Sequence, residues 1–129
     1  MTENLIPLDP QQRLWDQAFT VAPLVVVGTR EANGEWDLAP KHLAMPASWQ
    51  NHFVFVCTPA HATYGNARRD GRFTVTYVRP KQVLLASLAA APRCDSGEKR
   101  ELALIDTFPA PNGHGIFVSD GYFFLTCKL

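Results

Sequence analysis

Three observations predict a mainly β fold, a β-barrel with added helices. Short runs rich in β-branched and aromatic residues recur along the chain, and glycine or proline bounds most of them. The dipeptide Asn33-Gly34 is the strongest hairpin signal in the sequence. The helical patterns are all short. A chain of 129 residues, of which 47% are apolar, is long enough for one domain with a sizeable core. We therefore treat residues 1–129 as a single domain.

The first predicted strand, Leu24–Val27, is a β-branched run that we expect to be buried on both faces at its centre. The Asn33-Gly34 turn then leads back through a second strand, Glu35–Leu38. The next segment, Ala39–Ala47, contains two prolines, so we expect an irregular surface loop there.

Later strands show apolar runs or period-two alternation. Alternation within 73–78 predicts one face formed by Phe73, Val75 and Tyr77. The predicted later strands are His52–Cys57, Phe73–Val78, Gly115–Val118 and Tyr122–Leu129.

Three minor helices accompany these strands. One covers Pro10–Phe19, and a second covers Thr63–Arg69, starting near His61 or Thr63 and ending before Gly71. A third, alanine-rich helix covers Lys81–Ala91. The apolar stripe predicted for this third helix consists of Val83, Leu84, Ser87 and Leu88.

The charge balance excludes broad polyanion binding. Twelve basic residues oppose twelve acidic ones and the pI is 6.9, whereas a nucleic-acid binder would be basic; we therefore expect no nucleic-acid partner. Residues 61–81 nevertheless carry five cations against one acid, a net charge of +4. Such a segment suits a small anionic ligand, although a solvated helix face is the simpler explanation.

Cysteine usage and hydropathy indicate a cytoplasmic protein. Cys57, Cys94 and Cys127 are odd in number and lack metal-ligand spacing, so we expect free thiols in a reducing compartment and no metal site. The longest apolar stretches, Val21–Val27 and Val83–Ala91, are too short to cross a membrane, and residues 1–10 do not form a secretory signal.

Two stretches carry candidate site residues. On the loop 39–47, Lys41 could meet a phosphate or a polarised ring oxygen, and His42 could do the same or transfer a proton. At 57–66 a strand end leads into a helix start, whose free N–H groups suit an anion, with His61 and Thr63 adding side-chain donors. The alternatives are ordinary surface residues at 41–42 and simple helix capping by Thr63. Asp37 stands isolated, so paired-carboxylate chemistry has no support.

These stretches, in this order and with their flanking strands, resemble the flavin reductase-like, FMN-binding split-barrel family. The resemblance covers Val21–Leu129. It is carried by Asp37-Leu38-Ala39-Pro40, by His61-Ala62-Thr63-Tyr64-Gly65-Asn66, by Gly71-Arg72-Phe73-Thr74-Val75, and by the closing segment 121–129.

The resemblance implies a six-stranded split barrel, a homodimer with FMN near its interface, and NADH or NADPH as electron donor. Some members supply a monooxygenase partner. The matching loop against the isoalloxazine and ribityl chain is Ala39, Pro40, Lys41 and His42. The matching residues for ribityl and phosphate are Cys57, Thr58, His61, Ala62 and Thr63, and Asn66 matches a motif asparagine.

The chain departs from the family pattern in places. Asp37 stands where many relatives have asparagine, and His42 where many have serine. The family domain also continues with further strands past the position of Leu129, so we expect the chain to be incomplete at its C-terminus.

The leading hypothesis is an FMN-dependent oxidoreductase that transfers hydride from NAD(P)H to FMN, with His42 as the candidate catalytic residue. One alternative is an FMN-binding electron-transfer or flavin-carrier protein without NAD(P)H turnover. A second alternative is a cofactor-free β-barrel interaction module.

Overall fold

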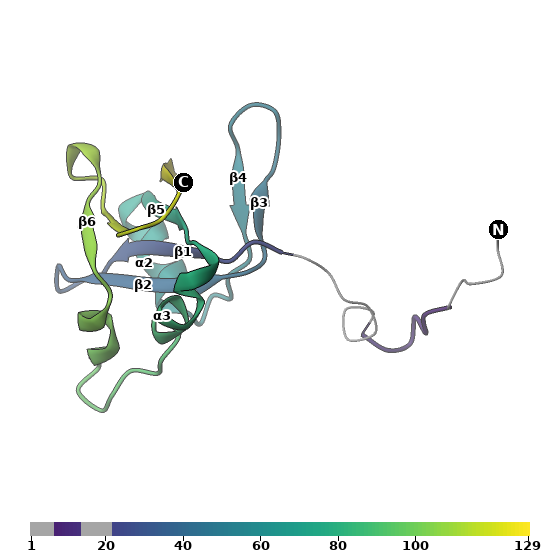
Figure 1. The fold of residues 1–129 in the computed structure, drawn as a ribbon, viewed down its shortest axis with the longest axis horizontal. Helices are drawn as coiled ribbons and strands as arrows, with labels where there is room; N and C mark the ends of the chain where they lie inside the picture. Colours follow the sequence, from purple (N-terminus) through teal and green to yellow (C-terminus); the bar gives the residue numbers. More distant parts are fainter. Residues whose placement is uncertain (1–6, 14–21) are drawn as a thin grey trace.

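A computed structural model describes residues 7–13 and 22–129, and its fold is mainly β, as the sequence predicts (Figure 1). The strands are β1 (Val25–Arg30), β2 (Trp36–Lys41), β3 (Ala44–Pro46), β4 (Phe53–Phe55), β5 (Arg72–Tyr77), β6 (Thr107–Pro109), β7 (Ile116–Val118) and β8 (Phe123–Lys128). The helices are α2 (Ala62–Asp70) and α3 (Val83–Leu88), with single 3₁₀ turns at η1 (Pro80–Gln82), η2 (Arg100–Leu104) and η3 (Pro111–Gly113).

The strands form one four-stranded antiparallel sheet and two two-stranded ribbons. The sheet has the order β2-β1-β5-β8, and the ribbons pair β3 with β4 and β6 with β7. In the described part of the chain these sheets do not close into a complete barrel, so β2 and β8 are both sheet edges.

The first hairpin forms as predicted. β1 pairs with β2 in the register Val25↔Lys41 to Arg30↔Trp36, and Gly34 in the turn has a φ of 93°. Val25, Val26 and Val27 are each at most 1% exposed, which confirms burial on both faces of this strand.

The irregular loop predicted over Ala39–Ala47 is wrong, because β2 continues to Lys41 and β3 follows at Ala44. The two prolines do not interrupt the ladders. Glu31 N–H donates to Glu35 O, and hydrogen-bonded pairs alternate along an antiparallel ladder. Ala39 and Lys41 therefore bond to β1, and Pro40 directs its nitrogen to the free edge of β2. Pro46 is placed in the same way on β3, since Ala47 N–H donates to His52 O.

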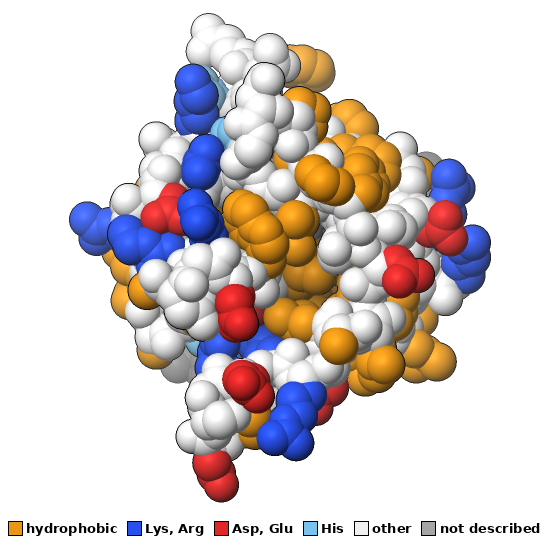
Figure 2. All heavy atoms as spheres, turned by 90° about the vertical axis from the view of Figure 1, so that its left-hand side faces the viewer, with side chains coloured by type: hydrophobic (Ala, Val, Ile, Leu, Met, Phe, Trp, Pro, Cys, Tyr) orange, Lys and Arg blue, Asp and Glu red, His pale blue; other side chains and the backbone are white. Residues whose placement is uncertain are grey.

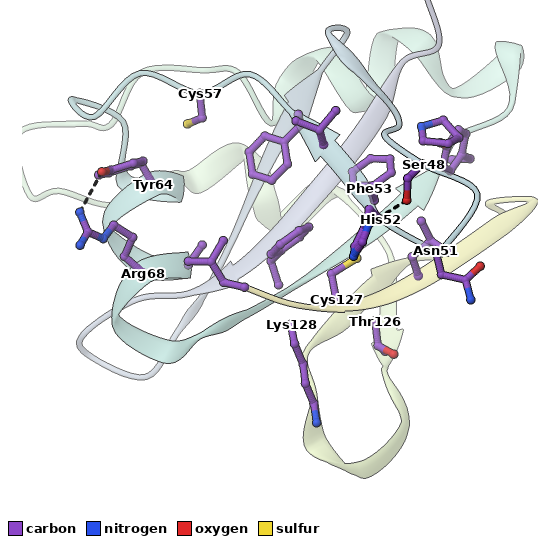
Figure 3. Close-up of a pocket in the computed structure, with 18 of the residues that line it drawn as sticks. Ser48, Asn51, His52, Phe53, Cys57, Tyr64, Arg68, Thr126, Cys127 and Lys128 are labelled. Atoms are coloured by element: carbon purple, nitrogen blue, oxygen red, sulfur yellow. Dashed lines mark hydrogen bonds between the residues drawn. The ribbon is translucent and has the colours of Figure 1, made fainter.

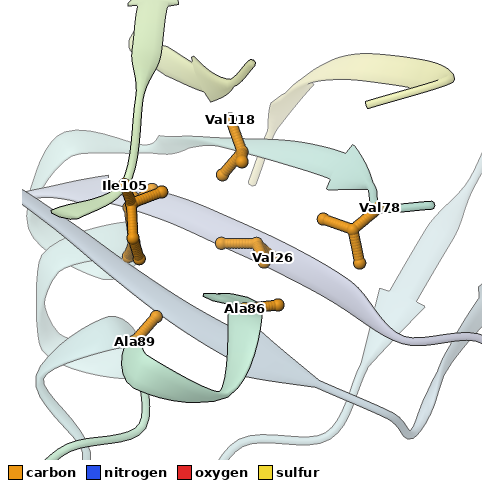
Figure 4. Packing of buried hydrophobic residues seen from close by; sticks show 7 residues of the cluster. Val26, Val78, Ala86, Ala89, Ile105 and Val118 are labelled. Carbon is orange, nitrogen blue, oxygen red and sulfur yellow. The ribbon is translucent and has the colours of Figure 1, made fainter. Parts of the chain in front are cut away.

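The two faces of the sheet pack against different elements. On one face, Val26 and Leu38 join side chains from α3, η2 and β7, including Ala86, Ile105 and Val118 (Figure 4). The opposite face packs against α2 and the β3–β4 ribbon, and its buried cluster consists of Val25, Val27, Ala44, Ala67, Phe73 and Val75. We call these the α3 face and the α2 face.

Two threonines of β5 attach β7 to the α3 face. Thr74 Oγ1 donates to Ile116 O at 2.6 Å, and Val118 N–H donates to Thr76 Oγ1 at 3.1 Å. This approach requires Gly28 on the neighbouring strand, since a Cβ there would lie 2.4 Å from Thr74 Oγ1. The predicted alternation of β5 is therefore confirmed, with Phe73, Val75 and Tyr77 on the α2 face.

The helix predictions have different outcomes. α2 follows the expected boundaries, with His61 at the N-cap position and Gly71 ending the helix at a φ of 64°. The stripe predicted for α3 is wrong: Val83 and Leu84 are 49% and 81% exposed. The small residues Ala86 and Ala89 face the core instead, because they let this short helix lie close to the sheet.

The helix predicted over Pro10–Phe19 falls mainly outside the described residues; at its start, Asp9 Oδ1 accepts a hydrogen bond from Gln11 N–H. Across residues 7–13 and 22–129, no helix has the length and apolar character needed to span a bilayer.

Candidate functional site

The β3–β4 ladder brings the two predicted site stretches together. Val56 N–H donates to Leu43 O at 2.9 Å, one step beyond the pair Ala44↔Phe55. Continuing this register by one residue places His42 opposite Cys57. The end of β2, with Lys41, therefore meets the chain segment that leads into α2.

The first turn of α2 has open donors beside this junction. His61 occupies the N-cap position, but no side chain caps the helix, so its first N–H groups are available to solvent or a ligand. Cys57 Sγ lies 3.9 Å from His61 Nδ1, which ties the strand end to the helix start. Free N–H groups at a helix N-terminus suit a phosphate. The donor set at this junction therefore fits the phosphate-bearing end of a flavin mononucleotide.

The predicted site residues differ in accessibility. His42, Thr58, His61 and Ala62 are exposed, and Pro40, Lys41 and Cys57 are half-buried. Ala39 and Thr63 are buried, at 7% and 2% exposure. Thr63 lies in the first turn of α2 and is not the N-cap, so the alternative in which Thr63 caps the helix is wrong.

Asn66 is occupied by contacts within the protein. Its Nδ2 donates to Thr29 Oγ1 at 3.2 Å, and its Oδ1 accepts from Arg69 Nη1 at 3.2 Å. Since Asn66 is only 5% exposed, its amide holds α2 against β1. This is a structural position beside the junction.

Asp37 is not isolated, contrary to the sequence prediction. Its buried carboxylate lies 2.8 Å from Lys99 Nζ and 3.4 Å from Arg93 Nη2. Lys99 also donates to Leu38 O and Ala89 O, so this lysine fastens the polar segment 92–100 to β2 and the end of α3. Sequence reasoning missed the contact because 61 residues separate Leu38 from Lys99.

The α2 face contains a groove of about 870 Å³ between the β3–β4 ribbon and β8 (Figure 3). Its floor is aromatic: the Phe55 and Phe73 ring centroids lie 5.2 Å apart, and those of Phe53 and Tyr77 lie 6.5 Å apart. Cys57 is the predicted site residue that contributes to its lining. The apolar run of β4 and the alternation of Leu125 and Cys127 with polar residues in β8 were the sequence signals for this surface. Neither signal revealed that the two strands face each other across a gap.

Burial in this groove raises the pKa of two side chains. It raises the pKa of the Cys127 thiol to about 11, because the thiolate would lose hydration there. Burial is also the main cause that raises the pKa of Tyr77, with the neighbouring Tyr122 and Cys127 adding to it. The groove floor is thus a poor environment for charge.

The basic segment 61–81 is largely engaged by neighbouring groups. Arg69 bonds to Asp70 at 2.8 Å and also contacts Arg30 O, while Lys81 pairs with Asp120. Arg68 lies at the edge of the groove, where Nη1 donates to Tyr64 Oη at 3.0 Å. Most of this charge therefore forms a solvated surface, and Arg68 is the cation of this segment that lies beside the groove.

Figure 2 shows one end of the molecule, where apolar side chains gather in a hollow and charged side chains surround it.

Comparison with known proteins gives one family. A family model described as the flavin reductase like domain matches residues 18–129. A search among curated proteins found no match to this sequence.

Several solved structures share the fold. Flavoredoxin of Desulfovibrio vulgaris (Miyazaki F) superposes with a TM-score of 0.78 at 18% identity, over 96% of this chain and 67% of that one. Nitrilotriacetate monooxygenase component B from Bacillus cereus gives 0.76 at 17% identity, over 98% and 69%. An FMN-binding domain of a flavin reductases-like enzyme from Shewanella baltica OS155 gives 0.72 at 17% identity, over 83% and 56%. The chain thus spans between 56% and 69% of the length of these structures.

Proposed function

The chain belongs to the flavin reductase-like domain family, as its motifs predict, and we propose that it binds FMN at the junction of β2, β4 and α2 and reduces it with NADH or NADPH. One observation carries the proposal. The β3–β4 ladder aligns His42 with Cys57 and so brings the end of β2 to the segment that leads into α2, whose first turn has open N–H groups. These groups complement a flavin phosphate and the polar edge of its ring.

Each residue has a distinct role in this proposal. FMN, when bound, supplies a ring that accepts hydride from the nicotinamide donor. The backbone N–H groups of Ala62 and Thr63 and the Lys41 ammonium would hold the phosphate, while Ala39, Pro40 and Thr58 border the ring and ribityl chain. Cys57 and His61 contact each other where the strand end meets the helix start, and the buried Asn66 holds α2 against β1.

His42 is the proposed proton donor, since its imidazole is exposed at the junction. The variant His42→Ala should lower turnover by more than it lowers FMN affinity. Steady-state NADH oxidation and an FMN titration on the same preparation separate the two quantities. Unchanged turnover would remove His42 from the mechanism.

The test of the proposed function is the visible absorption spectrum of the purified protein, before and after incubation with FMN and gel filtration. A retained flavin band that NADH bleaches supports the oxidoreductase. A retained band without NADH oxidation in the presence of added FMN supports the electron-transfer or carrier alternative. Absence of a band contradicts flavin binding and supports the cofactor-free barrel.

We further propose a cytoplasmic homodimer that passes reduced flavin to a monooxygenase partner. The name of the similar Bacillus cereus structure, component B of a nitrilotriacetate monooxygenase, supports this type of partner. Sedimentation equilibrium would measure the oligomeric state, and a single monomeric species would contradict the dimer.

A further inference from the structure

We propose that two copies of this chain form a two-fold dimer through the outer face of the β3–β4 ribbon. This face consists of Leu43, Met45, Val54 and Val56. The inference names the interface of the homodimer put forward with the proposed function, and it rests on that part of it alone. The ribbon stands out from the four-stranded sheet and ends in the loop at residues 47–52 (Figure 1). Its outer face is therefore within reach of another molecule.

The four aliphatic side chains share one face because of the register of the ladder. Met45 lies opposite Val54. The next bond along the ladder, from Val56 N–H to Leu43 O, adds a second outward pair. Directly opposed residues lie on the same side of a ribbon, and the alternate pair, which includes Phe55, packs inward on the α2 face. The four outward side chains are between 45% and 61% exposed.

The loop at the end of the ribbon exposes a tryptophan on a hydrogen-bonded turn. Ser48 Oγ lies 2.7 Å from His52 Nδ1, and Gln50 N–H donates to Ser48 Oγ at 3.1 Å. Trp49, which lies between these bonded residues, is fully exposed. Tryptophan is highly buried on average in folded proteins, and it is enriched among the residues that dominate the binding energy of interfaces. We therefore assign Trp49 to the same interface.

The ribbon lacks the charges that would select a different protein as partner. Charged residues make up 19% of the chain, yet no Asp, Glu, Lys or Arg occurs between Lys41 and Arg68. Complementary charge supplies much of the specificity between different proteins. Around a two-fold axis, by contrast, a charged side chain would lie near its own copy and be repelled. An uncharged apolar face therefore fits a second copy of this chain.

The exposed apolar area is large enough for a specific pair. The four aliphatic side chains and Trp49 together expose roughly 500 Å². A symmetric pair would bury about twice that area, roughly 1,000 Å², which is the size at which specific interfaces begin. Depletion of charge and the presence of Trp and Met are also typical of the buried centre of an interface.

We expect the two ribbons to pack face to face and not edge to edge. Pro46 directs its nitrogen to the free edge of β3, so that edge lacks an N–H group at this position. A strand added beside β4 would extend the layer of the ribbon itself and would leave its outer face open. Covering this face requires a second layer, which the ribbon of another copy supplies at a spacing of about 10 Å.

Charge substitutions at Met45 test the interface. Met45→Asp and Met45→Lys each place like charges on the two copies, so either should raise the dimer dissociation constant at least about tenfold in sedimentation equilibrium. Mixing the two variants should restore pairing, because opposite charges then face each other, whereas mixing would not repair a folding defect. Leu84→Asp is the matched control: Leu84 is 81% exposed on α3, and its substitution should leave association unchanged.

Photo-cross-linking identifies what covers the ribbon. Benzoylphenylalanine takes the place of Val54, and copies with and without a heavy-isotope label are mixed before irradiation. We expect cross-linked peptides that join a labelled copy to an unlabelled one through residues 43–56. Cross-links confined to single copies would show that the chain covers its own ribbon, and would overturn the proposal.

Three results in the sedimentation experiment would also overturn it. These are a monomer at every concentration, equal weakening by Met45→Asp and Leu84→Asp, and a dimer that Met45→Asp leaves intact. The first would contradict the homodimer as a whole, whereas the other two would contradict this interface alone. FMN retention, measured on the same preparations, reports separately on the proposed oxidoreductase.

Discussion

The α3 face and the α2 face are built from the same strands but are covered to different extents. On the α3 face, hydroxyls of Thr74 and Thr76 fix β7 against the sheet, and Phe124 packs between Phe108 and Phe117. On the α2 face, α2 covers one part of the sheet and a groove of about 870 Å³ occupies the rest. Phe123, adjacent to Phe124 on β8, remains 49% exposed there.

This difference separates structural residues from candidate functional ones. The hydroxyl contacts of β5 hold β7 on the α3 face, and the buried ion pair of Asp37 with Lys99 holds segment 92–100 against β2. The open donors of α2 and the His42–Cys57 junction belong to the α2 side or its margin. We therefore expect the flavin site at the margin of the α2 face.

The largest expected effect compares neighbours on β8. Phe124→Ala should lower the free energy of unfolding by about 3 kcal/mol, because it removes the contacts of this ring with Phe108 and Phe117. Phe123→Ala should cost about 1 kcal/mol, since half of that side chain is already exposed. Urea unfolding of both variants measures the difference. Equal losses would show that the two faces are equally covered.

Thiol reactivity distinguishes the groove from the surface. The Ser96 hydroxyl bond is the main cause that lowers the pKa of Cys94, whereas burial raises the pKa of Cys127 to about 11. At pH 8 Cys127 should react with iodoacetamide about 100-fold more slowly than a thiol of ordinary pKa, and Cys94 should react first. The Cys127 rate should increase as the pH rises toward 11, as peptide mass spectrometry can measure.

The same pKa has a consequence for stability. The folded state holds the Cys127 proton more tightly than the unfolded chain, so the stabilisation is complete below the ordinary thiol pKa and is lost as the pH rises toward 11. Cys127→Ala should remove this part of the alkaline loss of stability. An unchanged pH profile in that variant would contradict burial of the thiol.

A smaller effect is expected where β7 crosses β1. Gly28→Ala should destabilise the protein by about 2 kcal/mol, because the new Cβ would lie 2.4 Å from Thr74 Oγ1 and 3.1 Å from Ile116 O. Gly65→Ala is the matched control: no atom lies within 4 Å of its Cβ, and alanine should stabilise α2 by about 0.5 kcal/mol. Thermal unfolding that ranks the two variants in the reverse order would refute this close packing.

The smallest effect concerns the margin of the α2 face. Lys41→Met should weaken FMN binding by about 1 kcal/mol, roughly fivefold, and should leave riboflavin affinity unchanged, because the ammonium would contact the phosphate. Fluorescence titration with both flavins measures this. Equal loss for the two ligands would place Lys41 away from the phosphate.

Sequence patterns predicted those parts of the fold that local chemistry determines. Burial of Val25–Val27, the turn at Gly34 and the end of α2 at Gly71 follow from β-branching and from backbone conformations that glycine adopts easily. The order of the motifs also predicted the family. Loop 39–47 was mispredicted because proline at a free edge costs no ladder bond, a property of the sheet rather than of the segment.

Long-range contacts account for the remaining differences. The Lys99–Asp37 pair joins residues far apart in the sequence, and no periodicity signals it. The orientation of α3 depends on how closely Ala86 and Ala89 can approach the sheet, which helical spacing alone does not determine. Both candidate site stretches were identified in the sequence, but their alignment depends on the β3–β4 ladder.

Cysteine footprinting with FMN tests the central claim most directly, since the chain carries a thiol at the proposed junction and another on the remote polar segment. Alkylation of Cys57 should slow in proportion to FMN occupancy, while the Cys94 rate should not change. Retained FMN with an unchanged Cys57 rate would contradict a flavin site at the junction of β2, β4 and α2.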